Sequence, residues 1–111
     1  MNNDFQYDFT SLAAGTHYSP TYKYNEGGPI DRMETTLNLT TLGGTGTVDC
    51  LPQYSYDNVT FFDHTTSFTQ LSAAGSESLN LNTIGLFMRW KFTVTAGSSP
   101  LATGKLYAIA K

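Results

Sequence analysis

The nine residues Phe87–Thr95, FMRWKFTVT, alternate strictly between apolar and polar side chains. Successive side chains on a β-strand point to opposite faces, so this pattern predicts a strand with one buried and one solvated face. Half-buried strands of this kind are typical of antiparallel sheets. The apolar face carries Met88, Trp90, Phe92 and Val94. This position favours a core role for Trp90 over stacking of its ring on a sugar.

The period of two recurs along the chain, whereas Gly, Pro, Thr or Ser interrupts every window of helical length. Besides residues 87–95, the expected strands are 5–9, 22–24, 35–39, 47–56, 59–62, 66–71, 77–82 and 105–110. We expect the last strand to pair with strand 87–95 as a hairpin. Pro52 has no N–H for a ladder, so it predicts a sheet edge or a bulge. About seven or eight short strands in residues 34–111 predict an all-β fold, an antiparallel, jelly-roll-like β-sandwich.

The composition narrows the range of partners. Charged residues make up 14% of the chain and the net charge is −3. No Lys or Arg occurs between Arg32 and Arg89. Nucleic acids and anionic membranes are bound through clustered cations, so we expect neither as a partner. A single cysteine, Cys50, excludes an intrachain disulfide, and the first residues lack the pattern of a secretory signal.

The first third of the chain mixes turn-forming residues with aromatic side chains, and Gly27-Gly28-Pro29 then interrupts it. These rings need burial, and two placements would supply it. They close one end of the sandwich, or they pack on a neighbouring molecule. We define residues 1–33 as an extended N-terminal arm and residues 34–111 as the β-sandwich domain. Aromatic rings in such an arm add large contact area at low entropic cost.

No combination of residues indicates catalysis or a cofactor. His17 and His64 are the only histidines, and Asp63 next to His64 would point to the opposite face of a strand. We therefore expect His64 to be a polar loop residue. Two distant histidines and Cys50 do not form a zinc site. Asp57 and Asp63 flank a turn, but no calcium-loop pattern surrounds them. The chain is thus expected to be non-enzymatic, with no catalytic residue, metal or cofactor.

The stretch YSYDNVTFF, residues 54–62, predicts a tight hairpin around Asp57-Asn58, since Asn tolerates the positive φ that hairpin turns require. The hairpin would place Tyr54, Tyr56, Val59 and Phe61 on one face as packing partners. The opposite face would hold Ser55, Thr60 and Phe62, which leaves Phe62 as an outward ring for a partner to cover.

Residues 54–95 resemble the β-sandwich pattern of small virion structural proteins of tailed bacteriophages. The resemblance lies in the YSYDNVTF hairpin, the GSESLNL strand and the IGLFMRWK strand. It is carried by Asp57, Asn58, Gly85, Phe87 and Arg89. A related arrangement occurs in discoidin-like carbohydrate-binding modules, although this chain lacks their loop tryptophans and longer loops.

The resemblance implies a capsid cement or decoration protein. Such a protein binds the major capsid protein on the outer lattice of the virion and is often a homotrimer. Partner-binding residues would be the arm rings and the outward ring of the hairpin: Phe5, Tyr7, Phe9, Tyr18, Tyr22, Tyr24 and Phe62. The alternative is a tail-associated module that binds a receptor or carbohydrate. On that alternative, a concave aromatic patch is expected at one end of the sandwich.

Overall fold

The computed structural model describes residues 4–23, 32–43, 46–82, 85–95 and 101–110. Over these residues the chain forms nine β-strands and no helix, and thus no helix that could span a membrane. The strands are β1 (Asp4–Leu12), β2 (Gly15–Tyr18), β3 (Tyr22–Lys23), β4 (Met33–Leu42), β5 (Thr47–Ser55), β6 (Phe62–Asp63), β7 (Gly75–Leu81), β8 (Phe87–Thr95) and β9 (Ala102–Ala110).

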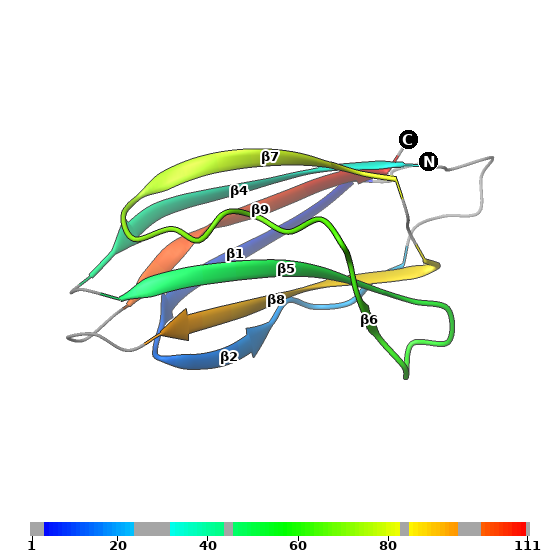
Figure 1. The fold of residues 1–111 in the computed structure, drawn as a ribbon, viewed down its shortest axis with the longest axis horizontal. Coiled ribbons are helices and arrows are strands. Elements are labelled where there is room, and N and C mark those ends of the chain that lie inside the picture. The colour runs from blue at the N-terminus through cyan, green and yellow to red at the C-terminus, as the bar shows by residue number, and fades with distance from the viewer. Residues whose placement is uncertain (1–3, 24–31, 44–45, 83–84, 96–100, 111) are drawn as a thin grey trace.

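The strands form two antiparallel sheets that stack face to face (Figure 1). The first sheet has the order β1-β9-β4-β7, and the second has the order β2-β8-β5-β6 with β3 also beside β8. The predicted all-β sandwich is therefore confirmed. The expected hairpin between the last strand and β8 is wrong. β9 pairs with β1 and β4 in the other sheet, because β5 on one side and β2 and β3 on the other already occupy both edges of β8.

The core lies between the sheets and follows the alternation of the sequence. The apolar face of β8 is almost completely buried, with each side chain at most 2% exposed. Trp90 stacks on Phe5 at 5.3 Å between ring centroids, with 8° between the ring planes. The core role predicted for Trp90 is confirmed. All four strands of the first sheet contribute buried residues, among them Phe9, Met33, Leu37, Leu39, Leu81 and Leu106.

The N-terminal residues are part of the sandwich. β1 pairs with β9 from Asp4 to Leu12, and β2 and β3 pair with β8. The prediction of an extended arm outside a 34–111 domain is therefore wrong for residues 4–23. The physical reason is the alternation of Phe5, Tyr7 and Phe9, whose rings cover core surface that β8 and β9 would otherwise expose.

One edge of β5 is covered by an irregular segment instead of a full strand. Leu71 and Val48 exchange two backbone hydrogen bonds, and Phe68 donates one to Cys50. The strand expected at 66–71 is therefore wrong, because only Leu71 forms an isolated bridge there. Of the strand expected at 59–62, only Phe62 lies in a strand, β6. The backbone carbonyl of Pro52 accepts a hydrogen bond from His64 where β6 ends. Pro52 thus lies between two neighbours and without a register shift, so the expected sheet edge or bulge is wrong; its missing N–H falls where the pairing with β6 ends.

Candidate functional site

The turn between β5 and β6 is held by side chains. One carboxylate oxygen of Asp57 accepts hydrogen bonds from the backbone N–H groups of Thr60 and Val59, each at 2.9 Å, and from the Ser55 hydroxyl at 3.0 Å. In the order Thr60, Val59, Ser55, these bonds lower the pKa of the Asp57 carboxyl. Asn58 adopts a φ of +62°, as predicted. The turn nevertheless spans residues 56–61, so the expected tight hairpin is wrong.

This longer turn reverses the predicted faces of two rings. Tyr54 pairs with Phe62 and with Met88, so Phe62 shares the face of Tyr54 and Phe61 takes the opposite one. The Tyr54 ring contacts the Tyr56 ring at 5.9 Å and the Phe62 ring at 5.6 Å between centroids.

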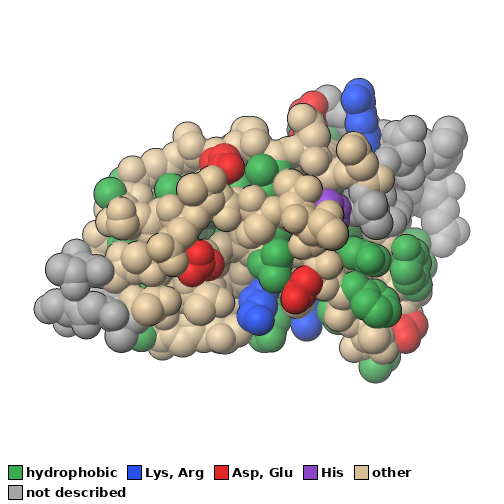
Figure 2. Space-filling view, in the orientation of Figure 1, with side chains coloured by type: hydrophobic (Ala, Val, Ile, Leu, Met, Phe, Trp, Pro, Cys, Tyr) green, Lys and Arg blue, Asp and Glu red, His purple; other side chains and the backbone are tan. Residues whose placement is uncertain are grey.

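We call Tyr54, Tyr56, Val59 and Phe62 the aromatic tip. Tyr56 is 62% exposed, Val59 81% and Phe62 46%. Tyr56 thus packs on Tyr54 but stays largely exposed, and the interpretation of Val59 as a packing partner is wrong. Hydrophobic side chains gather at the end of the molecule that carries the β5–β6 turn (lower right in Figure 2). Large exposed apolar side chains that cluster in this way are typical of a surface that another molecule covers.

A second arrangement, the Arg89 cluster, lies on the outer face of the β2-β8-β5-β6 sheet. The Arg89 guanidinium lies over the Phe61 ring at 3.9 Å and over the Tyr18 ring at 4.2 Å. Its Nε donates a 2.7 Å hydrogen bond to the Gln53 amide oxygen, and the Gln53 amide nitrogen donates a 2.7 Å bond to Asp63. Because Arg only donates and a carboxylate only accepts, the orientation of the amide is fixed.

The seven residues expected to bind a partner fall into different places. Phe9 is in the core, and Phe5, Tyr7 and Tyr22 pack against the core half-buried. Tyr18 and Phe62 are exposed, on the Arg89 cluster and the aromatic tip respectively. Tyr24 lies outside the described residues. A partner-binding role therefore stays a prediction for Tyr18 and Phe62.

The polar groups most often used in catalysis are occupied or shielded. His64 is buried, and its Nδ1 accepts a hydrogen bond from the Thr66 N–H. It lies in the loop that follows β6, as expected, and its side chain is buried there. Burial raises the pKa of the Cys50 thiol well above its usual value, which makes it a poor nucleophile. Nowhere in the described ranges do three or more His, Cys, Asp or Glu side chains form a group that could hold a metal ion.

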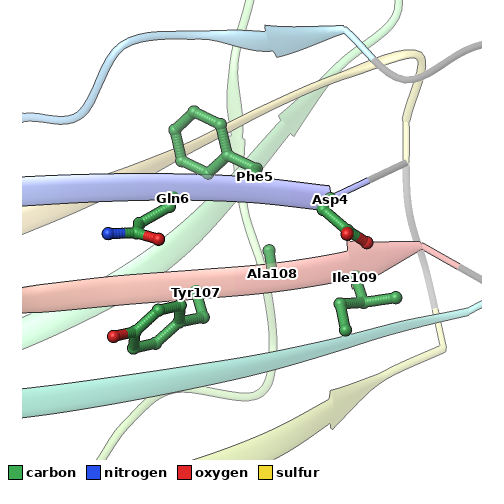
Figure 3. Close-up of a pocket in the computed structure, with 6 residues that line it drawn as sticks. All are labelled: Asp4, Phe5, Gln6, Tyr107, Ala108 and Ile109. Carbon is green, nitrogen blue, oxygen red and sulfur yellow. The ribbon is translucent and has the colours of Figure 1, made fainter. Parts of the chain in front are cut away.

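A hollow of about 360 Å³ lies on the first sheet, where β1 meets β9 (Figure 3). Gln6 and Tyr107 are register partners on its outer face, and so are Asp4 and Ile109. Phe5 and Ala108 complete the lining. Asp4 is its one carboxylate, so the lining lacks the acid pair that a glycosidase needs. It is a weaker candidate for a site than the aromatic tip.

Comparison with known proteins finds similarity in fold and none in sequence families. No protein family model and no curated protein sequence matches it. The crystal structure of the Yersinia pseudotuberculosis-derived mitogen is similar with a TM-score of 0.52 and 13% identity, over 100% of this chain and 88% of that one. PirA is similar with a TM-score of 0.53 and 10% identity, over 100% and 95% of the two chains. At these identities the likeness shows a shared fold.

A part of the infectious bursal disease virus structure is also similar. The TM-score is 0.47 and the identity 9%, over 97% of this chain and 29% of the viral chain.

Proposed function

We propose that this β-sandwich is a non-enzymatic virion protein of the capsid cement or decoration type, which docks on the outer capsid lattice through the aromatic tip. The observation that carries the proposal is the exposure of Tyr56, Val59 and Phe62 together at one end of the sandwich. Aromatic side chains are enriched at the centres of protein interfaces, where they supply most of the binding free energy. A virion location and the major capsid protein as partner are supported by the resemblance of residues 54–95 to phage structural proteins.

In this proposal the aromatic tip makes the contact with the capsid that the sequence analysis assigned to an N-terminal arm. A truncation of residues 2–28 would remove β1, β2 and β3, and with them the ring of Phe9 from the core. Such a truncation would unfold the protein, so it cannot test attachment separately. Homotrimeric assembly remains part of the proposal, because several tips on one particle would add avidity to weak single contacts.

The test uses a tip variant and a matched control. The tip variant is Tyr56→Ser with Phe62→Ser, and the control is Tyr107→Ser with Ile109→Ser on the outer face of the first sheet. Both variants replace two exposed apolar side chains. Purified protein is mixed with virion capsids that lack it, and sedimentation measures the bound fraction.

We expect the wild-type protein and the control to sediment with capsids, and the tip variant to lose at least about tenfold in affinity. Equal binding by the two variants would refute docking through the tip. Failure of the wild-type protein to bind any capsid would refute the cement role.

A tail-associated carbohydrate-binding module is the second candidate, because the tip places aromatic rings at one end of the sandwich; the concave shape expected of such a patch is a separate requirement, and the hollow of Figure 3 lies at β1 and β9 instead. Tyr54 and Tyr56 lie edge to face, with 75° between their ring planes. A glycan array separates the two functions. Binding of a defined sugar that the tip variant loses, together with no capsid binding, would favour the carbohydrate-binding module.

A further inference from the structure

Half of the cations of this acidic chain lie on the outer face of one sheet. The chain has six Lys and Arg residues against nine Asp and Glu. Arg89 and Lys91 follow each other on the polar face of β8, and Lys23 on β3 is the register partner of Phe87, two residues before Arg89. In Figure 2, Lys and Arg side chains lie in the lower middle of the molecule, beside hydrophobic side chains and an acidic one.

These cations occupy three successive rows of the sheet. Residues two apart on a strand are separated by about 7 Å, so the three rows extend over about 13 Å along β8. Lys23, Arg89 and Lys91 therefore start from backbone positions in three successive rows of the sheet's outer face. An extended acidic segment, with carboxylates at every second residue, has the matching spacing.

Arg89 is the preorganised member of this line. Two rings hold its guanidinium, and Gln53 holds its Nε. An Arg side chain has five N–H donors, and among the described residues only the Nε–H of Arg89 donates to a protein acceptor, which leaves the terminal fork that fits a carboxylate. The nearby carboxylate of Asp63 accepts its hydrogen bond from Gln53. A guanidinium held in this way loses little side-chain entropy when it binds a carboxylate.

We propose that this outer face is a docking site for an acidic protein segment, with Arg89 as its central contact and Lys91 and Lys23 on either side. The inference rests on the proposed function to the extent that the acidic segment belongs to the capsid partner. It deepens that function, because the aromatic tip supplies apolar contact whereas the Arg89 cluster selects for negative charge. The same β6 strand joins the two surfaces, through Phe62 on one face and Asp63 on the other.

A synthetic peptide tests the charge requirement without the capsid. The probe is a ten-residue peptide of alternating Glu and Thr, with an alternating Gln and Thr peptide as the neutral control and a hyaluronan fragment as an acidic sugar. Fluorescence anisotropy measures each Kd at low and high salt.

Arg89→Gln is expected to weaken binding of the acidic peptide at least about tenfold, and Arg89→Lys by an intermediate factor because Lys lacks the fork. Lys91→Gln, which keeps the rings of the cluster, should weaken it about threefold. Lys105→Gln removes the same charge on the other sheet and should leave the Kd unchanged. Circular dichroism checks that each variant is folded.

Equal affinity for the neutral peptide, tighter binding of hyaluronan, or the same Kd for Arg89→Gln and Lys105→Gln would each overturn the proposal. Sedimentation with capsids then separates the two ideas. If the wild-type protein attaches to capsids but the acidic peptide binds Arg89→Gln as tightly as the wild-type protein, the acidic docking site is wrong and the cement role stands. If the acidic peptide binds through Arg89 but no capsid does, the cement role is wrong and the acidic docking site stands.

Discussion

Alanine substitutions of Phe9 and Phe62 test whether β1 is a strand of the folded core or part of an arm outside it. Phe9 and Phe62 both qualified as partner-binding rings, yet Phe9 is 2% exposed in β1 whereas Phe62 is 46% exposed on β6. The Phe9 ring packs on the Phe92 ring at 4.9 Å and on the Tyr7 ring at 5.9 Å between centroids. Phe9→Ala and Phe62→Ala remove the same atoms, so their difference reports burial.

The expected magnitudes follow from the area that each ring buries. A fully buried aromatic side chain removes about 150–250 Å² from water, worth about 4–6 kcal/mol as an upper bound. Buried Phe→Ala substitutions cost about 3–5 kcal/mol, which we expect for Phe9. Phe62 buries about half as much and borders solvent, so no closed cavity remains and the expected cost is about 1–2 kcal/mol. At about 4 °C per kcal/mol, the losses in Tm are about 12–20 °C and 4–8 °C.

Urea unfolding measures both variants through one internal probe. Trp90 is the single tryptophan and is fully buried, so its fluorescence changes when the core opens. The difference in the free energy of unfolding is taken at an unchanged m-value. A loss below about 1 kcal/mol for Phe9→Ala, or equal losses for the two variants, would mean that β1 is not part of the folded core. The prediction of an N-terminal arm outside the core would then be correct.

Two further predictions test the sheet and the turn. A Cβ on Gly104 would overlap the backbone carbonyl of Asn38, whereas one on Gly75 would lie 3.8 Å from a Leu71 methyl group. In the same urea titration, Gly104→Ala should therefore lower the free energy of unfolding by about 1–3 kcal/mol or more, whereas Gly75→Ala should change it by less than about 1 kcal/mol. Equal effects of the two substitutions would contradict the pairing of β9 with β4. The pKa of the Asp57 carboxyl is lower in the folded than in the unfolded protein. The stability that the Asp57 carboxylate contributes is therefore fully present above the unfolded pKa of about 3.9, and it is lost as the pH falls through the folded pKa. Amide exchange of Val59 and Thr60, followed by NMR, should accelerate over that range in the wild-type protein and show no such step in Asp57→Asn.

Alternation in the sequence predicts well which segments are strands and which of their faces is buried, but it does not predict which strands are adjacent in a sheet. The strand over Phe87–Thr95 has the predicted bounds, and its apolar side chains fill the core. The partner of β9 was missed because alternation determines which face is buried and carries no information about the adjacent strand. β2 was missed because its four residues have no clear pattern and are held by pairing with β8.

The two candidate surfaces were harder to predict, because the register between strands decides which side chains share a face. A shift of one residue moves every side chain to the other face of a strand. The hydrogen bonds of Asp57 and Ser55 make the turn longer than a tight hairpin, and Phe61 and Phe62 exchange faces as a result. The adjacent pair of rings was the available signal, since one of two neighbouring rings must point away from the other. The Arg89 cluster had no local signal, because Tyr18 and Phe61 reach Arg89 only through the sheet order.

The two-residue strand β6 explains why both surfaces lie at the same end. Phe62 on one face joins Tyr54 in the aromatic tip, while Asp63 on the other face holds Gln53, which in turn orients Arg89. The preceding Phe61 covers the guanidinium, so one short hairpin supports an apolar surface and a cationic one. A partner that wraps around β6 would contact both and would gain affinity from each without a deep pocket. Because the Asp57 hydrogen bonds set the register of this hairpin, the carboxylate that orders the turn also controls both candidate binding surfaces.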